Sequence, residues 1–435
     1  MKFKLFILIP LFFFSKLNGQ SIYFPPLTGN TWDTLAPASL GWCSKRIDSL
    51  YNYLGNNSTK AFILLKDGKI VLEKYFGTHT STSPWMWASA GKTITAFMVG
   101  IAQQEKYLSI SEPSSKYLGK GWTICTTEQE DKITIRNQLT MTSGLDDDVA
   151  DHYCTLDTCL QYKADAGTRW AYHNGPYTLL DKVIENATGS TLNNYTASKL
   201  KLQTGMTGTF YTVDYNHVFF STARSMARFG LLILNKGNWN GKQIMTDTAY
   251  FRQMVNTSQN INQSYGYLWW LSGKTKYMLP GSQIVFNGSF NPNSPSDAVI
   301  AMGKDGQFLN VVPGKNLVWL RMGESPDGLP VPFLLNDKIW EYVNKLECNS
   351  LGDVLPENKE SFHIYPNPVN DQIRIESKKN IQKIEILAIN GQKIKEIPAT
   401  ESHQPISMLD LPAGLLFLRI YSKEYQPVVL KFFKQ

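Results

Sequence analysis

Ser89-Ala90-Gly91-Lys92 is the stretch that decides the fold of this chain. It places a hydroxyl group and an amine three residues apart at the start of an expected helix, and residues at that spacing share one helix face. The Lys92 amine can therefore reach the Ser89 hydroxyl and take its proton, which makes serine a nucleophile in several hydrolases. Unpaired N–H groups at a helix N-terminus also suit the oxyanion of acyl transfer. Apolar residues at helical spacing in 94–101 predict that this helix is buried.

A second Ser-x-x-Lys match runs from Ser198 to Lys201, inside the polar segment 193–201. We expect that segment at the surface. A match to so short a motif carries little weight by itself. The choice of Ser89 rests on the motifs that follow it along the chain.

Tyr172-His173-Asn174 is the second motif, and 166–170 leads into it. A phenol held between two cations would have a lowered pKa and could relay a proton to the leaving group. The Asn174 amide could bind both a substrate carbonyl and Lys92. Tyr-x-Asn recurs at 342–344 and 365–367, so a tyrosine in a loop followed by an asparagine turn is the alternative interpretation.

The third motif is Gly303-Lys304-Asp305-Gly306-Gln307, ahead of the apolar segment 308–312. At a strand edge, Lys304 would be a fixed positive charge near the site. Gly306 would let the substrate approach the backbone, and the Gln307 N–H could complete an oxyanion hole. Asp-Gly between two apolar strands is equally typical of a plain hairpin turn.

The order of expected elements predicts an α+β fold. Strand-like segments lie near both ends of the main body, with a helical section between them, so one sheet is built from distant segments. The expected strands are 61–65, 70–75, 299–302, 308–312 and 317–320. The expected helices are 43–54, 177–188, 221–235 and 331–346, and a largely helical section begins at 133.

The N-terminus has the pattern of a signal peptide. Lysines flank the start of a short apolar run, and a polar exit follows, so we expect residues 1–19 to be removed. The run is too short to span a bilayer, and we expect no stable membrane span elsewhere. Of the net charge of +7, the first 20 residues carry three lysines and no acid, and 361–435 carry ten basic and seven acidic residues. The main body is left near neutrality, which argues against a nucleic-acid partner.

Five cysteines in an exported chain allow two disulfides and one free thiol. Cys154 and Cys159 are close enough to close a small loop. Cys43 and Cys348 can meet if the terminal helices of the main body pack together, which leaves Cys125 free. The alternative is five unpaired cysteines that pack as small apolar residues. The scattered histidines offer no zinc-like spacing.

The composition changes after Cys348. Residues 351–360 form a polar linker, and 361–435 contain several short strands separated by turns, which predicts a small β-sandwich. The expected strands are 372–376, 383–388, 392–397, 415–421 and 427–433, with a turn at Asn390-Gly391.

Together, the three motifs resemble the serine β-lactamase and penicillin-binding-protein superfamily, in particular its class C-like, β-lactamase-related serine hydrolases. That family has Ser-x-x-Lys, Tyr-x-Asn and (Lys/His)-x-Gly in this order. The resemblance covers 43–346 and includes 139–145, 167–170 and 221–230; the last is similar to a helix of its esterases and 6-aminohexanoate-dimer hydrolases. It implies a β-lactamase/transpeptidase-like antiparallel sheet flanked by helices, with a helical subdomain, over residues 20–350.

The resemblance also implies roles for individual residues. Ser89 would be acylated, Lys92 would be its base and Tyr172 the proton relay. Asn174 would orient the substrate, and Lys304 would stand at the Lys/His of the triplet. The N–H groups of Ser89 and Gln307 would form the oxyanion hole. No metal or organic cofactor is implied.

Asp305 departs from the family pattern, because lactamases and transpeptidases usually have Thr or Ser there to hold the substrate carboxylate. A carboxylate that faced the cleft would repel such a substrate. We therefore expect a secreted hydrolase of a neutral or amine-bearing small ester or amide. The alternatives are a D-amino-acid peptidase acting on peptidoglycan, a β-lactamase, and a non-catalytic binding protein that acts as a sensor.

Residues 361–435 resemble the sorting domain of type IX secretion. The matching stretches are 364–368, 389–393, 411–414 and the terminal 431–435. The resemblance implies passage through the periplasm to the cell surface or medium, recognition by the type IX machinery, and removal of the tail. A carbohydrate- or protein-binding β-sandwich is the alternative.

Overall fold

The computed structural model describes residues 22–326, 331–348, 362–377, 380–388, 392–400, 404–422 and 428–435. The expected signal peptide, the linker 351–360 and the turn at Asn390-Gly391 lie outside these ranges. Within these ranges, the main body has a large hydrophobic core inside 32–346 and a small cluster at Trp122, Ile133, Leu145 and Leu160, and the tail has its own core inside 362–432. The main body and the tail are therefore described as separate units.

The main body is built on a six-stranded antiparallel sheet with the order β2-β1-β13-β12-β11-β8. Its first two strands come from the N-terminal part of the chain, and the others from beyond residue 269. This confirms a sheet assembled from distant segments. The strands are β1 (Thr59–Lys66), β2 (Lys69–Tyr75), β8 (Trp270–Leu271), β11 (Val299–Gly303), β12 (Gln307–Val312) and β13 (Leu317–Gly323).

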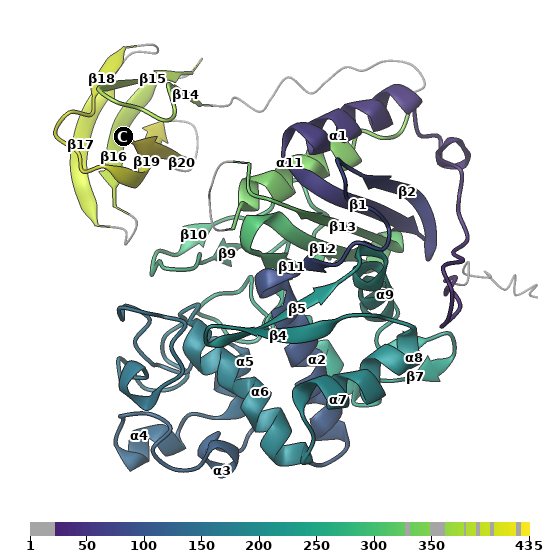
Figure 1. Cartoon of the computed structure of the whole chain (residues 1–435). Helices are drawn as coiled ribbons and strands as arrows, with labels where there is room; N and C mark the ends of the chain where they lie inside the picture. The colour runs from purple at the N-terminus through teal and green to yellow at the C-terminus, as the bar shows by residue number, and fades with distance from the viewer. Residues whose placement is uncertain are drawn as a thin grey trace, which may run out of the picture.

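Helices cover both faces of this sheet (Figure 1). On one face, α1 (Ser44–Asn56) packs against α11 (Phe333–Val343), and a Cys43–Cys348 disulfide joins the segments that flank them. On the other face, α9 (Ala223–Leu234) packs on β12 and β13. Gly230 permits this close approach, because an added Cβ would lie 2.6 Å from Val318 Cγ1. The predicted terminal helices and their disulfide are confirmed.

The residues between the two halves of the sheet form the expected helical region, which lies beside the sheet in Figure 1. The Cys154–Cys159 disulfide is present here and Cys125 is free, as predicted. The helices are α2 (Lys92–Gln104), α3 (Ser115–Leu118), α4 (Thr127–Asp131), α5 (Ile135–Leu139), α6 (Asn174–Thr188), α7 (Leu192–Thr196), α8 (Leu202–Thr204) and α10 (Thr248–Met254).

Several short strands in the main body lie outside the central sheet. One small sheet has the order β3-β5-β4 and borders the site described below. These strands are β3 (Trp85–Met86), β4 (Thr209–Val213), β5 (Asn216–Ser221), β6 (Asn238–Trp239), β7 (Lys242–Gln243), β9 (Lys276–Tyr277) and β10 (Phe286–Asn287).

The tail contains two antiparallel sheets, with orders β14-β15-β18 and β17-β16-β19-β20. Alternating residues such as Ile373 and Ile375 bury one face of β15, so the tail has the predicted β-sandwich form. The strands are β14 (His363–Tyr365), β15 (Gln372–Glu376), β16 (Ile381–Leu387), β17 (Lys393–Thr400), β18 (Pro405–Ser407), β19 (Gly414–Ser422) and β20 (Val428–Lys434). Within the described ranges of the whole chain, no helix has the length and apolar character needed to cross a membrane.

Candidate active site

Ser89 lies on a tight turn rather than inside the helix. A 3₁₀ turn over Ala88–Gly91 connects β3 to α2. Ala88 has a φ of 47°, a left-handed conformation that costs a non-glycine residue about 1 kcal/mol or more and is often found at functional sites. The buried Trp87 fixes the turn, because its backbone N–H donates to Phe219 O (2.8 Å) and its indole N–H donates to Ser221 Oγ (2.8 Å).

Lys92 is the first residue of α2, and its Nζ lies 3.0 Å from Ser89 Oγ. The side chain is buried, with 4% of the residue exposed. Aromatic rings enclose the amine, whose Nζ is 4.1 Å from the Tyr177 ring centroid and 5.3 Å from that of Tyr172. Burial lowers the pKa of Lys92 to about 7, against an opposing effect of Asp181. An amine with this pKa can accept a proton near neutral pH.

Tyr172 lies close enough to Ser89 for the serine side chain to act on its phenol. Its ring packs in an aromatic cluster, stacked on Trp270 with 6.1 Å between ring centroids and edge-on to Tyr265. The prediction of a lowered phenol pKa is wrong: burial raises the pKa of Tyr172, and the effect of Ser89 opposes this only in part. Tyr172 therefore stays protonated and can donate a proton.

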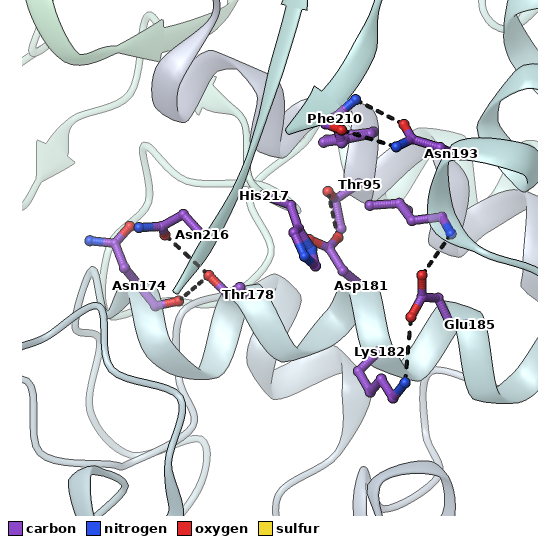
Figure 2. Close-up of polar contacts among 11 residues, drawn as sticks. Thr95, Asn174, Thr178, Asp181, Lys182, Glu185, Asn193, Phe210, Asn216 and His217 are labelled. Atoms are coloured by element: carbon purple, nitrogen blue, oxygen red, sulfur yellow. Dashed lines mark hydrogen bonds and ion pairs between the residues drawn. The ribbon is translucent and has the colours of Figure 1, made fainter. Parts of the chain in front are cut away.

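Asn174 is the first residue of α6, and only 4% of it is exposed. Its backbone carbonyl accepts a hydrogen bond from Thr178 Oγ1, which also contacts Asn216 Oδ1 (Figure 2). Its side-chain Oδ1 has no partner among the described residues. A buried amide oxygen without a partner is costly, and Asn174 is not among the residues that line the cavity described below.

Gly303, at the end of β11, brings the backbone of the third motif against Ser89. A Cβ added at Gly303 would overlap Trp87 O and lie 3.1 Å from Ser89 N. Lys304 follows, is exposed, and lines the same cavity as Ser89. Gln307 pairs with Gly303 across the hairpin, and its side chain is buried against Gly323, 2.6 Å from its carbonyl.

Gly306 and Asp305 belong to the turn between β11 and β12, and both have positive φ. The buried Arg321 stabilises this turn, because its guanidinium donates hydrogen bonds to Asp305 O (3.0 Å) and Gly306 O (2.7 Å). Asp305 is not among the residues that line the cavity. The prediction did not include Arg321, although an arginine inside the apolar stretch 317–323 was a usable signal.

The cavity at this site has a volume of about 530 Å³. Besides Ser89, Lys92 and Lys304, its wall carries two exposed carboxylates and two tyrosines from loops. These four residues are Asp151, Tyr153, Asp214 and Tyr215. The wall thus combines aromatic surface with charges of both signs.

The competing Ser198-x-x-Lys201 motif forms no such site. Ser198 Oγ donates to the carbonyl of Tyr195 (3.0 Å), and Lys201 Nζ donates to the carbonyl of Gly208 (2.6 Å). The two side chains are thus engaged with separate backbone groups.

In the described part of the chain, no three or more His, Cys, Asp or Glu side chains form a group that could hold a metal ion.

The family model described as Beta-lactamase matches residues 58–343. The chain belongs to the β-lactamase family. The match spans the central sheet from β1 to β13 and the helical region that carries Ser89, Lys92, Tyr172 and Asn174. The main body accordingly has the serine hydrolase fold of the β-lactamase family.

Solved structures with this fold carry several functional names. A protein from Bacillus anthracis described as a 6-aminohexanoate-dimer hydrolase is 20% identical, with a TM-score of 0.56 over 75% of this chain and 92% of that one. A penicillin-binding protein from Bacillus halodurans is 15% identical, with a TM-score of 0.52 over 68% and 99%. A family VIII carboxylesterase is 13% identical, with a TM-score of 0.52 over 70% and 99%. At these identities the likeness shows the fold alone. No curated protein matches the chain.

The tail matches the family model described as Secretion system C-terminal sorting domain over residues 363–435. The chain therefore combines a β-lactamase-family body with a sorting domain. A domain of this kind indicates a secreted or cell-surface protein.

Proposed function

We propose that the protein is a serine hydrolase that cleaves an ester or amide bond of a small substrate through an acyl-Ser89 intermediate. One observation carries this proposal: a buried amine with a pKa of about 7 lies 3.0 Å from a hydroxyl at the wall of a cavity. A serine hydroxyl is a weak nucleophile until a neighbouring base takes its proton.

In the acylation step, the neutral Lys92 amine takes the proton of Ser89 Oγ as this oxygen attacks the substrate carbonyl carbon. The N–H groups of Ser89 and Gln307 would stabilise the oxyanion, at the end of the β11–β12 hairpin that abuts Ser89. The Tyr172 hydroxyl donates a proton to the leaving group and regains one from the Lys92 ammonium. The Asn174 amide and the Lys304 charge orient the substrate.

Deacylation reverses these proton transfers. A water molecule attacks the acyl carbonyl while Lys92 takes one of its protons, and Ser89 Oγ leaves and is reprotonated. A neutral phenol suits this relay, because burial keeps the Tyr172 proton in place until the leaving group needs it.

The charges on the cavity wall favour neutral or amine-bearing substrates. We expected Asp305 to repel a substrate carboxylate, but Asp305 does not line the cavity. Asp151 and Asp214 do line it, so these two carboxylates would cause the repulsion. A substrate carboxylate can pair with Lys304, but it also meets both of these acids.

We therefore predict that the mature chain turns over neutral p-nitrophenyl esters with kcat/KM at least about 100-fold above that for a carboxylate-bearing β-lactam, since like charges cost a few kcal/mol. Steady-state assays on both substrates and on D-amino-acid amides measure this ratio. Efficient β-lactam or D-amino-acid amide hydrolysis without ester turnover would favour the lactamase or peptidase alternative. Rapid acylation without turnover would favour the sensor.

For the tail, we propose recognition by type IX secretion machinery after passage through the periplasm, followed by removal of the domain. A chain that lacks residues 361–435 should stay inside the cell envelope, whereas a full-length Ser89→Ala chain, which is unchanged in the tail, should be exported normally. Immunoblots of cell and medium fractions measure both. Export of the truncated chain at normal yield would contradict the proposal.

A further inference from the structure

A second pair of ionisable side chains lies behind Lys92 and has no part in the steps above. Asp181 is on α6 and His217 is on β5, and Figure 2 shows the two side chains directed at each other. His217 Nδ1 lies 3.1 Å from Asp181 Oδ2. The pair is therefore held by a direct hydrogen bond between distant parts of the chain.

Asp181 is buried, with 1% of its side chain exposed. Its other oxygen accepts a hydrogen bond from Thr95 Oγ1 (3.1 Å). Thr95 lies one turn after Lys92 on α2, and Tyr177 lies one turn before Asp181 on α6. The Lys92 amine lies over the Tyr177 ring, and the Asp181 carboxylate is close enough for its charge to act on that amine.

His217 connects this buried carboxylate to the cavity. Its side chain is 35% exposed, and it lines the same cavity as Ser89 and Lys92. A proton can therefore reach His217 from solvent, whereas Asp181 is closed off. The pair has net charge zero when His217 is protonated and Asp181 ionised, and carries one negative charge when His217 is neutral.

We propose that the Asp181–His217 pair sets the charge state of Lys92. His217 is reached by solvent, and its protonation decides whether the charge of the buried Asp181 carboxylate is compensated. With His217 neutral, the carboxylate charge favours the ammonium form of Lys92. With His217 protonated, that charge is compensated and Lys92 gives up its proton more readily. Asp181 and His217 are thus positioning residues, and this role rests on the proposed function of Lys92 as the base.

The directions of the pKa shifts agree with this coupling. Asp181 acts to raise the pKa of Lys92 against the larger effect of burial. The hydrogen bond to Asp181 raises the pKa of His217, and burial raises that of Asp181. The other ionisable groups that face the three residues or the cavity are Tyr172, Tyr177, Glu185, Lys182, Asp151, Tyr153, Asp214, Tyr215 and Lys304.

The test is the pH profile of kcat/KM for a neutral p-nitrophenyl ester with the full mature chain. In the wild type, the midpoint of the acidic limb of this profile should lie near the pKa of Lys92, about 7. Asp181→Asn removes the charge that holds the Lys92 proton, so we expect the limb to move by about one pH unit to lower pH. His217→Gln leaves that charge uncompensated, so the limb should move to higher pH. The double variant should behave as Asp181→Asn alone, because His217 acts through Asp181.

Lys338→Gln is the matched control, because it removes an exposed lysine charge on α11 that acts on neither Asp181 nor His217, and it should leave the limb in place. Thermal unfolding establishes that each variant is folded. The inference would be overturned if Asp181→Asn and His217→Gln moved the acidic limb in the same direction. It would also be overturned if Asp181→Asn were folded and active with its acidic limb at the wild-type pH. Failure of the proposed function gives a different result, namely an inactive wild type.

Discussion

Replacing Lys92 with methionine should lower kcat/KM for the ester substrate by about 10³-fold or more, while the protein stays folded. The loss follows because Ser89 Oγ then has no base within hydrogen-bond distance, and removal of a positioned base costs about 10²- to 10⁴-fold. Methionine keeps the shape of the side chain, so the change tests the amine itself. Steady-state kinetics and thermal unfolding on the same preparation measure both effects.

The same variant should be more stable than the wild type, most clearly below pH 7. Folding lowers the pKa of Lys92 from 10.5 to about 7, so the unfolded chain binds more protons between these values. Wild-type stability therefore rises with pH across that window, and the cost of the buried amine is fully present below it. Lys201→Met is the matched control: it alters the second Ser-x-x-Lys motif and should leave kcat/KM within about twofold. A large activity loss in this control, or none in Lys92→Met, would contradict the assignment.

Arg321→Met should lower the free energy of unfolding of the main body by about 3 kcal/mol or more. The guanidinium is fully buried and donates five hydrogen bonds, one to Thr59 Oγ1 and four to backbone carbonyls. The variant leaves these acceptors without donors. Two of the carbonyls belong to the turn that carries Lys304, so kcat/KM should also fall in the folded variant.

Urea unfolding followed by fluorescence measures this loss. The control is Arg252→Met, which removes an exposed arginine from α10 and should change stability by no more than about 0.5 kcal/mol. If the urea midpoint of Arg321→Met equalled that of the wild type, the stabilising role of the Arg321 hydrogen bonds would be wrong.

Local spacing was enough to predict the Ser89–Lys92 contact, because both residues share one helical turn. The antiparallel sheet, the terminal helices and both disulfides could also be predicted, since each follows from hydrophobic pattern or from the meeting of chain ends. The hairpin of β4 and β5 was missed. Its outer side chains are exposed, so it lacks the continuous apolar run by which the central strands were recognised.

Interactions between distant segments could not be predicted in this way. The close approach of the Gly303 backbone to Ser89 depends on how the β11–β12 hairpin packs against the Ser89 turn, and Gln307 pairs with Gly303 across that hairpin. The pKa of Tyr172 is raised rather than lowered, since packing of remote aromatic residues around the phenol desolvates it. The contact between Asp181 and His217 depends on how α6 and β5 pack, which no local pattern encodes.

The most direct test of the central claim is intact mass spectrometry of the mature chain mixed with a p-nitrophenyl ester, beside a Ser89→Ala control. We predict a mass increase equal to the acyl group, located by peptide mapping to Ser89, that decays as product is released and is absent from the control. A persistent adduct in Ser89→Ala, or an acyl group mapped to another residue, would contradict the claim that Ser89 is the nucleophile.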